Sequence, residues 1–219
     1  YGDHRDLHSF PTRRSSDLTK EGLIMSKRVI TINRMLGSNG RLIGRALADE
    51  LGFTFYDKEL IDIAAQKENI PFDILAKVDE KKGSQWRFPI EHELQLDSDF
   101  HFVPMNDVLF DLQRKIIVEA AQKEDCVIVG RCANHILEGN CLSVFIYAPF
   151  DYRVQTVMQR TGREEKSVQK MIRKVDKERR TYYEYFTDKK WTDFSQYHLA
   201  VDSSRFDQDT IIKMIKLGL

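Results

Sequence analysis

The sequence predicts an α/β protein in which a central parallel sheet is covered by helices on both faces. Two observations lead to this class. Residues 29–57 have the pattern of strand, glycine loop, helix and strand. Strand-like and helix-like segments then alternate from residue 106 to residue 215, which favours parallel strands joined by helical crossovers. A chain of 219 residues with 42% hydrophobic residues can bury one substantial core, so we expect one domain over residues 25–219.

The first unit begins with a buried strand at residues 29–32, which are β-branched and mainly apolar. Residues 37–40 read Gly-Ser-Asn-Gly, a composition that permits a tight turn with exposed backbone N–H groups. An amphipathic helix is expected next and ends at Gly52, before a second strand at residues 53–56. The apolar stripe of that helix consists of Ile43, Leu47 and Leu51, with Ala46 beside them.

The glycine loop and the helix after it predict an anion site. The first turn of an α-helix presents unpaired N–H groups and the positive end of the helix dipole, and both attract a phosphate. Here they face the loop at residues 37–40. The second strand finishes at an acid, Asp57. The unit therefore has the order strand, phosphate loop, helix, strand and acid.

After Asp57, helical spacing of apolar residues predicts a helix to about residue 69, and Pro71 opens another short helical run. The pattern becomes irregular between residues 83 and 104, so we expect an irregular cover or an insertion over a cleft. The apolar residues of the first helix are Leu60, Ile61 and Ala64, and the aromatic residues of the irregular stretch are Trp86, Phe88, Phe100 and Phe102.

A helix at residues 106–123 leads to a buried strand at residues 126–129. That strand ends in Gly130 and Arg131. Open α/β sheets bind their ligands at the carboxyl ends of the strands, so Arg131 is a candidate ligand-binding residue. The alternative is that Arg131 pairs with a nearby carboxylate.

A strand at residues 142–147 is followed by a helix that Pro149 opens. That helix ends near residues 159–163, and Glu164 and Glu165 begin the next one. The last strand is expected at residues 198–201. Asp207 is expected to cap a closing helix, whose apolar residues are Ile211, Met214 and Ile215.

The helix that begins at Glu164 has two stripes. A core stripe consists of Val168, Met171, Ile172 and Val175. An adjoining stripe consists of Arg173, Asp176, Arg180 and Tyr183, with Arg179 close by. Guanidinium groups gathered around one acid suit multidentate binding of phosphate. The alternative is a solvated, charged helix face.

Composition excludes several functional classes. Lys plus Arg and Asp plus Glu both number 34, so no net field favours a nucleic acid polymer or an anionic membrane as partner. The three cysteines lack the spacing of a zinc site or disulfide framework, and we expect reduced thiols. No apolar run reaches the roughly 20 residues that cross a bilayer. We therefore expect a cytoplasmic protein.

Residues 1–24 lack any sustained hydrophobic period, and we expect them to be disordered or not native to the protein. The run HRDLHSFPTRRSSDL resembles translated sequencing-adapter sequence, which makes Met25 the expected start. The alternative is a basic targeting arm.

From Met25 to its end, the chain resembles the cytidylate kinase-like branch of the P-loop nucleoside monophosphate kinases. The resemblance depends on ITINRMLGSNGRLIGRALADELG, FYDKELI, VIVGR, QRTGR and RKVDKERRTYY. It implies a P-loop kinase fold with an acceptor region at about residues 57–105 and an Arg-rich lid at about residues 160–190. It also implies transfer of the ATP γ-phosphate to a nucleotide substrate such as (d)CMP, with ATP and Mg²⁺ as cofactors.

The resemblance and the charged stripe together imply three sets of site residues. The donor phosphates are expected to bind Gly37, Ser38, Asn39, Gly40, Arg41, Leu42, Gly44 and Arg160. The acceptor nucleotide is expected to contact Asp57, Arg131, Asp176, Arg180 and Tyr183. The residues expected to be catalytic, through their charge, are Arg41, Arg131, Arg163, Arg173 and Arg179.

The loop departs from the phosphate-binding pattern G-x-x-x-x-G-K-[ST]. In register with that pattern, Arg34 replaces the first glycine, Gly40 replaces the lysine and Leu42 replaces the hydroxyl residue. Arg41 is the candidate for the missing charge, and Ser38 is the candidate hydroxyl ligand of magnesium.

Three alternatives to a cytidylate kinase type of enzyme follow. The first is a catalytically impaired nucleotide-binding or regulatory module, which the missing lysine motivates. The second is a kinase for another small metabolite. The third is a dinucleotide-binding enzyme, because Asp57 lies 20 residues beyond Gly37, where a ribose-binding acid is found in such proteins.

Overall fold

The computed structural model describes residues 27–57, 87–88 and 103–219. The leader at residues 1–24 and the helices expected between Asp57 and residue 83 lie outside the described residues. So does most of the irregular stretch at residues 83–104. Its two described parts form a short antiparallel pair of strands, which are β3 (Arg87–Phe88) and β4 (Val103–Pro104).

The centre of the molecule is a five-stranded parallel sheet with the order β2-β5-β1-β6-β7. In the central strand, Ile32 lies opposite Val129 on one side and Val144 on the other. The predicted parallel sheet is therefore confirmed. Its strands are β1 (Val29–Arg34), β2 (Thr54–Tyr56), β5 (Cys126–Val129), β6 (Leu142–Tyr147) and β7 (Leu199–Asp202).

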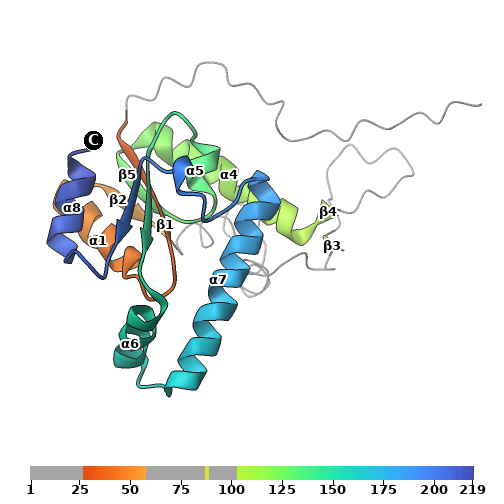
Figure 1. Ribbon diagram of the computed structural model, residues 1–219. Coiled ribbons are helices and arrows are strands. Elements are labelled where there is room, and N and C mark those ends of the chain that lie inside the picture. Colours follow the sequence, from red (N-terminus) through yellow and green to blue (C-terminus); the bar gives the residue numbers. More distant parts are fainter. Residues whose placement is uncertain (1–26, 58–86, 89–102) are drawn as a thin grey trace, which may run out of the picture.

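Helices cover both faces of the sheet, as Figure 1 shows. The helices α1 and α8 lie on one face, and α4 and α5 lie on the other. The helices are α1 (Gly40–Leu51), α4 (Met105–Lys123), α5 (Ala133–Ile136), α6 (Phe150–Thr161), α7 (Glu165–Thr187) and α8 (Gln208–Lys216), with a 3-10 helix, η2, at Phe194–Gln196. Among the described residues, none of these helices has the length and hydropathy needed to cross a bilayer.

Side chains of the central strand β1 enter the core on both faces of the sheet, because successive side chains of a strand point to opposite faces. Val29 packs beneath α4, whereas Ile30 and Ile32 pack beneath α1 and α8. A smaller apolar cluster joins α6 to α7 through Val157 and Ile172. These two helices therefore form a hairpin with a core of its own.

The topology places the crevice of the sheet at the carboxyl end of β1. The connection from β1 leads to β2 on one side, and the connection from β6 leads to β7 on the other. This is a topological switch point, where open α/β sheets bind their ligands. The α6–α7 hairpin extends beyond this edge of the sheet (Figure 1). The loops after β1 and β6 flank this point, and the loops after β2 and β5 lie along the same edge of the sheet.

Candidate nucleotide-binding site

The loop between β1 and α1 has the tight backbone that its glycines predict. Gly37 has a φ of 84°, and a Cβ there would lie 2.8 Å from the carbonyl oxygen of Arg153, so only glycine fits. Asn39 is the left-handed residue that precedes α1. Its side-chain oxygen accepts a hydrogen bond from Arg160 of α6 rather than capping α1. The N-terminus of α1 therefore faces Arg160.

A hollow of about 210 Å³ lies at the N-terminus of α1. Four guanidinium-bearing side chains line it together with the loop, so an anion in the hollow meets both positive charge and helix N–H groups. Its lining residues are Arg34, Met35, Leu36, Gly37, Asn39, Gly40, Arg41, Leu42, Arg160 and Arg179. The hollow is lined by six of the eight residues expected to bind the donor phosphates, and phosphate binding there stays a prediction.

Ser38 holds the loop against β6. Its side chain is fully buried, and its hydroxyl lies 2.9 Å from the carbonyl oxygen of Met35 and 3.0 Å from that of Ile146. This geometry does not fit the expected role as a magnesium ligand, because the hydroxyl is turned toward backbone carbonyls. Among the described residues that line the hollow, none carries a carboxylate or a hydroxyl for a hard cation. The residues of the hollow therefore do not fit a protein-held magnesium ion.

Gly44 packs α1 against the sheet. A Cβ at this position would lie 3.0 Å from Ile32 Cδ1 and 3.3 Å from Val129 Cγ2. A glycine is therefore explained by close packing of helix and sheet, and the expected phosphate contact at Gly44 is not supported. Leu42, by contrast, is 47% exposed at the rim of the hollow.

Asp57 is buried between two arginines. It is 4% exposed, it accepts a hydrogen bond from Arg41 Nε, and its Oδ1 lies 3.6 Å from Arg34 Nη2. We expected Asp57 to bind the acceptor nucleotide, but its carboxylate is engaged by the protein's own guanidinium groups. Arg41 keeps a half-exposed side chain at the hollow.

Arg131 and Arg179 come together at the carboxyl edge of the sheet. Arg131 follows β5 in a left-handed conformation with a φ of 57°. Both arginines line a small cavity of about 30 Å³ beside Arg34, and Arg179 Nη1 donates a hydrogen bond to the Arg34 carbonyl oxygen at 3.2 Å. These two predicted catalytic arginines therefore lie near the hollow, with Arg34 between them.

Asp176 supports the loop instead of facing a substrate. Its Oδ1 accepts a hydrogen bond from the Leu36 amide at 2.8 Å, and its Oδ2 accepts one from Arg153 Nη1 at 2.5 Å. Arg153 also donates to the carbonyl oxygens of Leu36 and Ala148, at 3.1 and 3.0 Å. Both carboxylate oxygens are engaged by the protein, which favours a structural role for Asp176, and its expected contact with substrate stays a prediction. Arg153 was not predicted from the sequence. The available signal was a charged residue next to Val154, which is also buried in α6.

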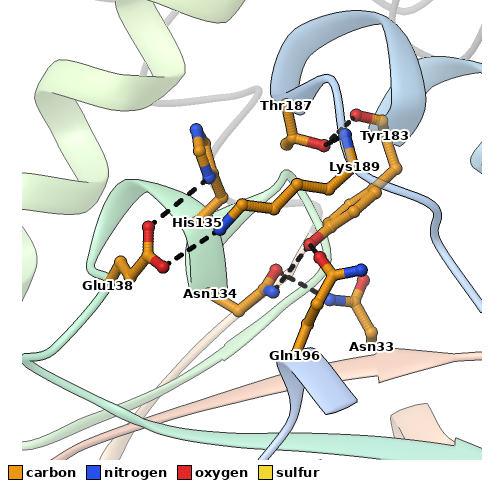
Figure 2. A network of polar contacts seen from close by, with 8 residues as sticks. All are labelled: Asn33, Asn134, His135, Glu138, Tyr183, Thr187, Lys189 and Gln196. Carbon is orange, nitrogen blue, oxygen red and sulfur yellow. Dashed lines mark hydrogen bonds and ion pairs between the residues drawn. The ribbon is translucent and has the colours of Figure 1, made fainter. Parts of the chain in front are cut away.

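Tyr183 belongs to a buried polar ladder, which Figure 2 shows. Its hydroxyl accepts a hydrogen bond from Asn134 Nδ2 at 2.9 Å and donates one to Gln196 Oε1 at 3.3 Å. Asn33 Nδ2 donates in turn to Asn134 Oδ1 at 2.9 Å. Burial raises the pKa of the Tyr183 phenol, which is 2% exposed. The ladder joins β1, α5, α7 and η2. Tyr183 also lines the small cavity beside Arg131, so its expected contact with an acceptor stays a prediction.

The remaining arginines of the predicted lid lie on exposed surface. Arg163 occupies the turn between α6 and α7, and Arg173 and Arg180 lie on α7. The Arg173 guanidinium lies 4.7 Å from the centre of the Phe150 ring. None of these three residues lines the described hollow. An Arg-rich lid is therefore not confirmed, and their expected functions stay predictions.

Fold and site together define a class of protein. The strand order, the glycine loop between β1 and α1, and an arginine-lined hollow at the switch point are those of a P-loop kinase fold. Residues 29–205 match the model of the cytidylate kinase-like family, so the chain belongs to that family. Fold and family together support a kinase for a nucleotide or another small metabolite.

Two curated relatives are cytidylate kinases. The enzyme of Methanopyrus kandleri is 23% identical over 202 residues, which cover 87% of this chain and 92% of that protein. The enzyme of Pyrococcus furiosus is 26% identical over 193 residues, which cover 87% and 88% of the two chains.

Solved structures give the same fold. An uncharacterised protein from Eubacterium ventriosum has a TM-score of 0.62 and 28% identity, with coverage of 87% of this chain and 99% of that chain. A shikimate kinase from Bacteroides thetaiotaomicron has a TM-score of 0.52 and 14% identity, with coverage of 88% and 99%. At that identity the second likeness concerns the fold alone.

Proposed function

We propose that this protein transfers the γ-phosphate of ATP to a nucleoside monophosphate of the CMP type. The observation that carries the proposal is the hollow at the N-terminus of α1, where Arg34, Arg41, Arg160 and Arg179 meet. The family match and the two relatives named cytidylate kinase support a nucleotide as the acceptor. In this proposal the donor phosphates occupy the hollow, and the acceptor lies on the side of Arg131.

Catalysis of phosphoryl transfer consists mainly of positioning and charge neutralisation. The backbone N–H groups at the start of α1 and the guanidinium groups of Arg41 and Arg160 would bind the donor phosphates. Arg160 is already oriented toward the loop by its hydrogen bond to Asn39. Arg131 would neutralise charge on the acceptor side, next to Arg179.

The alternatives differ in what they need from the site. A dinucleotide-binding enzyme needs an acid that can accept from a ribose hydroxyl, whereas Asp57 is buried between Arg34 and Arg41. That alternative is not supported. A regulatory module without turnover, or a kinase for another small metabolite, needs the same hollow and must be separated from our proposal by experiment.

The experiment is an acceptor panel on the full chain. ADP formation is followed with ATP, magnesium and one acceptor at a time from CMP, dCMP, UMP and shikimate, and calorimetry measures the binding of ATP. We expect ADP formation that depends on CMP or dCMP. Binding of ATP without turnover for any acceptor would favour the regulatory module, and turnover with shikimate alone would favour a metabolite kinase.

Substitution of Arg41 tests the replacement of the missing lysine. Arg41→Ala should lower kcat about 100-fold or more, because it removes a positive charge at the phosphates. The free energy of unfolding should fall by about 1 to 3 kcal/mol, because the buried Asp57 carboxylate loses one of its two cationic partners. The matched control is Arg45→Ala, an exposed arginine one turn further along α1, which should keep its turnover. Full activity of Arg41→Ala would refute the role of Arg41.

A further inference from the structure

The side chain of Arg34 follows a path that two glycines leave open. A Cβ at Gly40 would lie 2.5 Å from Arg34 Cβ and 3.2 Å from Arg34 Cγ, so the stem of Arg34 rests on Gly40. A Cβ at Gly130 would overlap Arg34 Nη1, so the guanidinium group rests on Gly130. Since Gly130 follows β5, the side chain runs from the end of β1 across the end of the neighbouring strand.

The guanidinium group of Arg34 is held at the far side of this path by Asp57. Arg34 Nη2 lies 3.6 Å from Asp57 Oδ1, and Asp57 follows β2, the next strand in the sheet. Arg34 thus spans the carboxyl ends of three adjacent strands. Its side chain is 12% exposed and that of Asp57 is 5% exposed. A guanidinium group fixed in this way needs little reorganisation when charge develops beside it.

Arg34 also lies where the two candidate subsites meet. It lines the hollow of about 210 Å³ with Arg41 and Arg160, and it lines the cavity of about 30 Å³ with Arg131. Asp57 faces two cations, Arg34 and Arg41, so two positive charges and one negative charge leave one positive charge in excess. Donor and acceptor must meet within contact distance for transfer. Arg34 and Arg179 are the two residues that line both spaces, so a group transferred from one space to the other would pass beside them.

We propose that Arg34 is a further catalytic residue, which adds a fixed positive charge to that of Arg41 at a site that lacks the P-loop lysine. This inference deepens the proposed function and depends on it. An oxygen of the acceptor phosphate attacks the γ-phosphorus, and the bond between that phosphorus and the bridging oxygen breaks. The electron pair of that bond stays on the β-phosphate of ADP. Arg34 neutralises charge on the equatorial oxygens of the transferred group, and Asp57 is its positioning residue.

The first test removes the charge of Arg34 but keeps its stem over Gly40. Arg34→Met should lower kcat about 100-fold or more, and the Kd of ADP should change less than about threefold, because ADP lacks the group that Arg34 contacts. The Kd of inorganic tripolyphosphate, measured by calorimetry, should rise at least about tenfold. A folded Arg34→Met protein with unchanged kcat and unchanged affinity for tripolyphosphate would overturn the proposal.

The second test displaces the Arg34 side chain without substituting Arg34 itself. It also tests the proposal if the Arg34→Met protein does not fold. Gly130 and Gly139 have nearly the same φ, 84° and 82°, but a Cβ at Gly139 meets no atom within 4 Å. Gly130→Ala should therefore lower kcat and weaken tripolyphosphate binding at least about tenfold more than Gly139→Ala does. Equal effects of the two substitutions would overturn the proposal.

The tripolyphosphate measurement separates this inference from the proposed function. If the wild-type chain phosphorylates no monophosphate, the proposed function fails. Tripolyphosphate binding to Arg34→Met and to the two glycine variants then still tests whether Arg34 binds a terminal phosphate. If the wild-type chain is active and these variants bind and turn over as the wild type does, only the role of Arg34 fails.

Discussion

Arg153 and Asp176 connect the phosphate loop to the two helices that rise beside it. Arg153 is 7% exposed and Asp176 is 8% exposed, and the pair also binds both the amide and the carbonyl group of Leu36. A buried ion pair adds little net stability compared with apolar residues, but loss of one partner leaves an uncompensated buried charge. This pair therefore holds the loop in position.

Asp176→Asn should lower the free energy of unfolding by about 3 to 5 kcal/mol, because Arg153 then keeps its charge in a buried place. The matched control is Glu50→Gln. Glu50 pairs with Lys216 at the same distance, 2.5 Å, but their side chains are 48% and 39% exposed. That control should cost less than about 1 kcal/mol. Urea unfolding of both variants measures the difference, and equal losses would contradict the structural role of Asp176.

At the scale of elements, α5 and the end of α7 are joined by a charged contact (Figure 2). Lys189, just after α7, lies 3.0 Å from Glu138, and His135 of α5 lies 3.9 Å from the same carboxylate. Burial is the main cause that lowers the pKa of His135. Lys189 and Arg114 lower it further, and Glu138 and Asp188 act in the opposite direction. The junction between these elements therefore favours a neutral imidazole.

This junction makes the stability depend on pH. The pKa of His135 is lower in the folded chain than the ordinary value of about 6.5, so the unfolded chain binds more protons between the two values. The contribution of neutral His135 to the free energy of unfolding is complete above about pH 6.5. It is lost as the pH falls from there through the lowered pKa of the folded chain. We expect the fall in Tm between about pH 7.5 and pH 5.5 to be smaller in His135→Gln than in the wild type.

Thermal unfolding at the two pH values checks this prediction. The control is the same pair of proteins above about pH 7.5, where the imidazole is neutral in both states and the two curves should run parallel. An identical fall in Tm for both proteins on acidification would show that His135 does not contribute.

For the whole molecule, the decisive feature is how the α6–α7 hairpin is attached to the sheet. Arg153 and Asp176 tie its base to the phosphate loop, whereas its tip extends beyond the carboxyl edge (Figure 1). Arg160 and Arg179 already line the hollow, but Arg163 and Arg173 do not. If all four arginines act on the phosphates, the tip must move toward the hollow while the base stays in place.

We therefore expect ATP and acceptor together to slow amide hydrogen exchange at residues 160–173. At ligand concentrations about 100 times the Kd, the slowing should reach up to about 100-fold. Mass spectrometry of the exchanged chain measures it, and helix α8 on the far side of α1 serves as the internal control. Protection of the phosphate loop without any at residues 160–173 would mean that the hollow binds its ligand without closure of the hairpin.

The sequence by itself determined the strands of the central sheet, most of the helices around it and their order. The strand at residues 142–147 and the helix ends at Gly52 and Gly162 match their expected places. The glycine loop before α1 does so as well. All of these depend on hydrophobic period and backbone freedom, which act between residues close together in the chain.

The tertiary structure alone decided which charged groups meet. Asp176 lies 140 residues from Leu36, whose amide it binds, and no local pattern connects the two. In the same way, the pairing of Arg34 with Asp57 depends on the strand order, in which β5 lies between β1 and β2. The candidate arginines and acids could be listed from the sequence, apart from Arg153, whose pairing with Asp176 was not predicted. Their division into ligand-binding and structural residues depends on contacts between distant segments, which form only when the sheet and helices pack together.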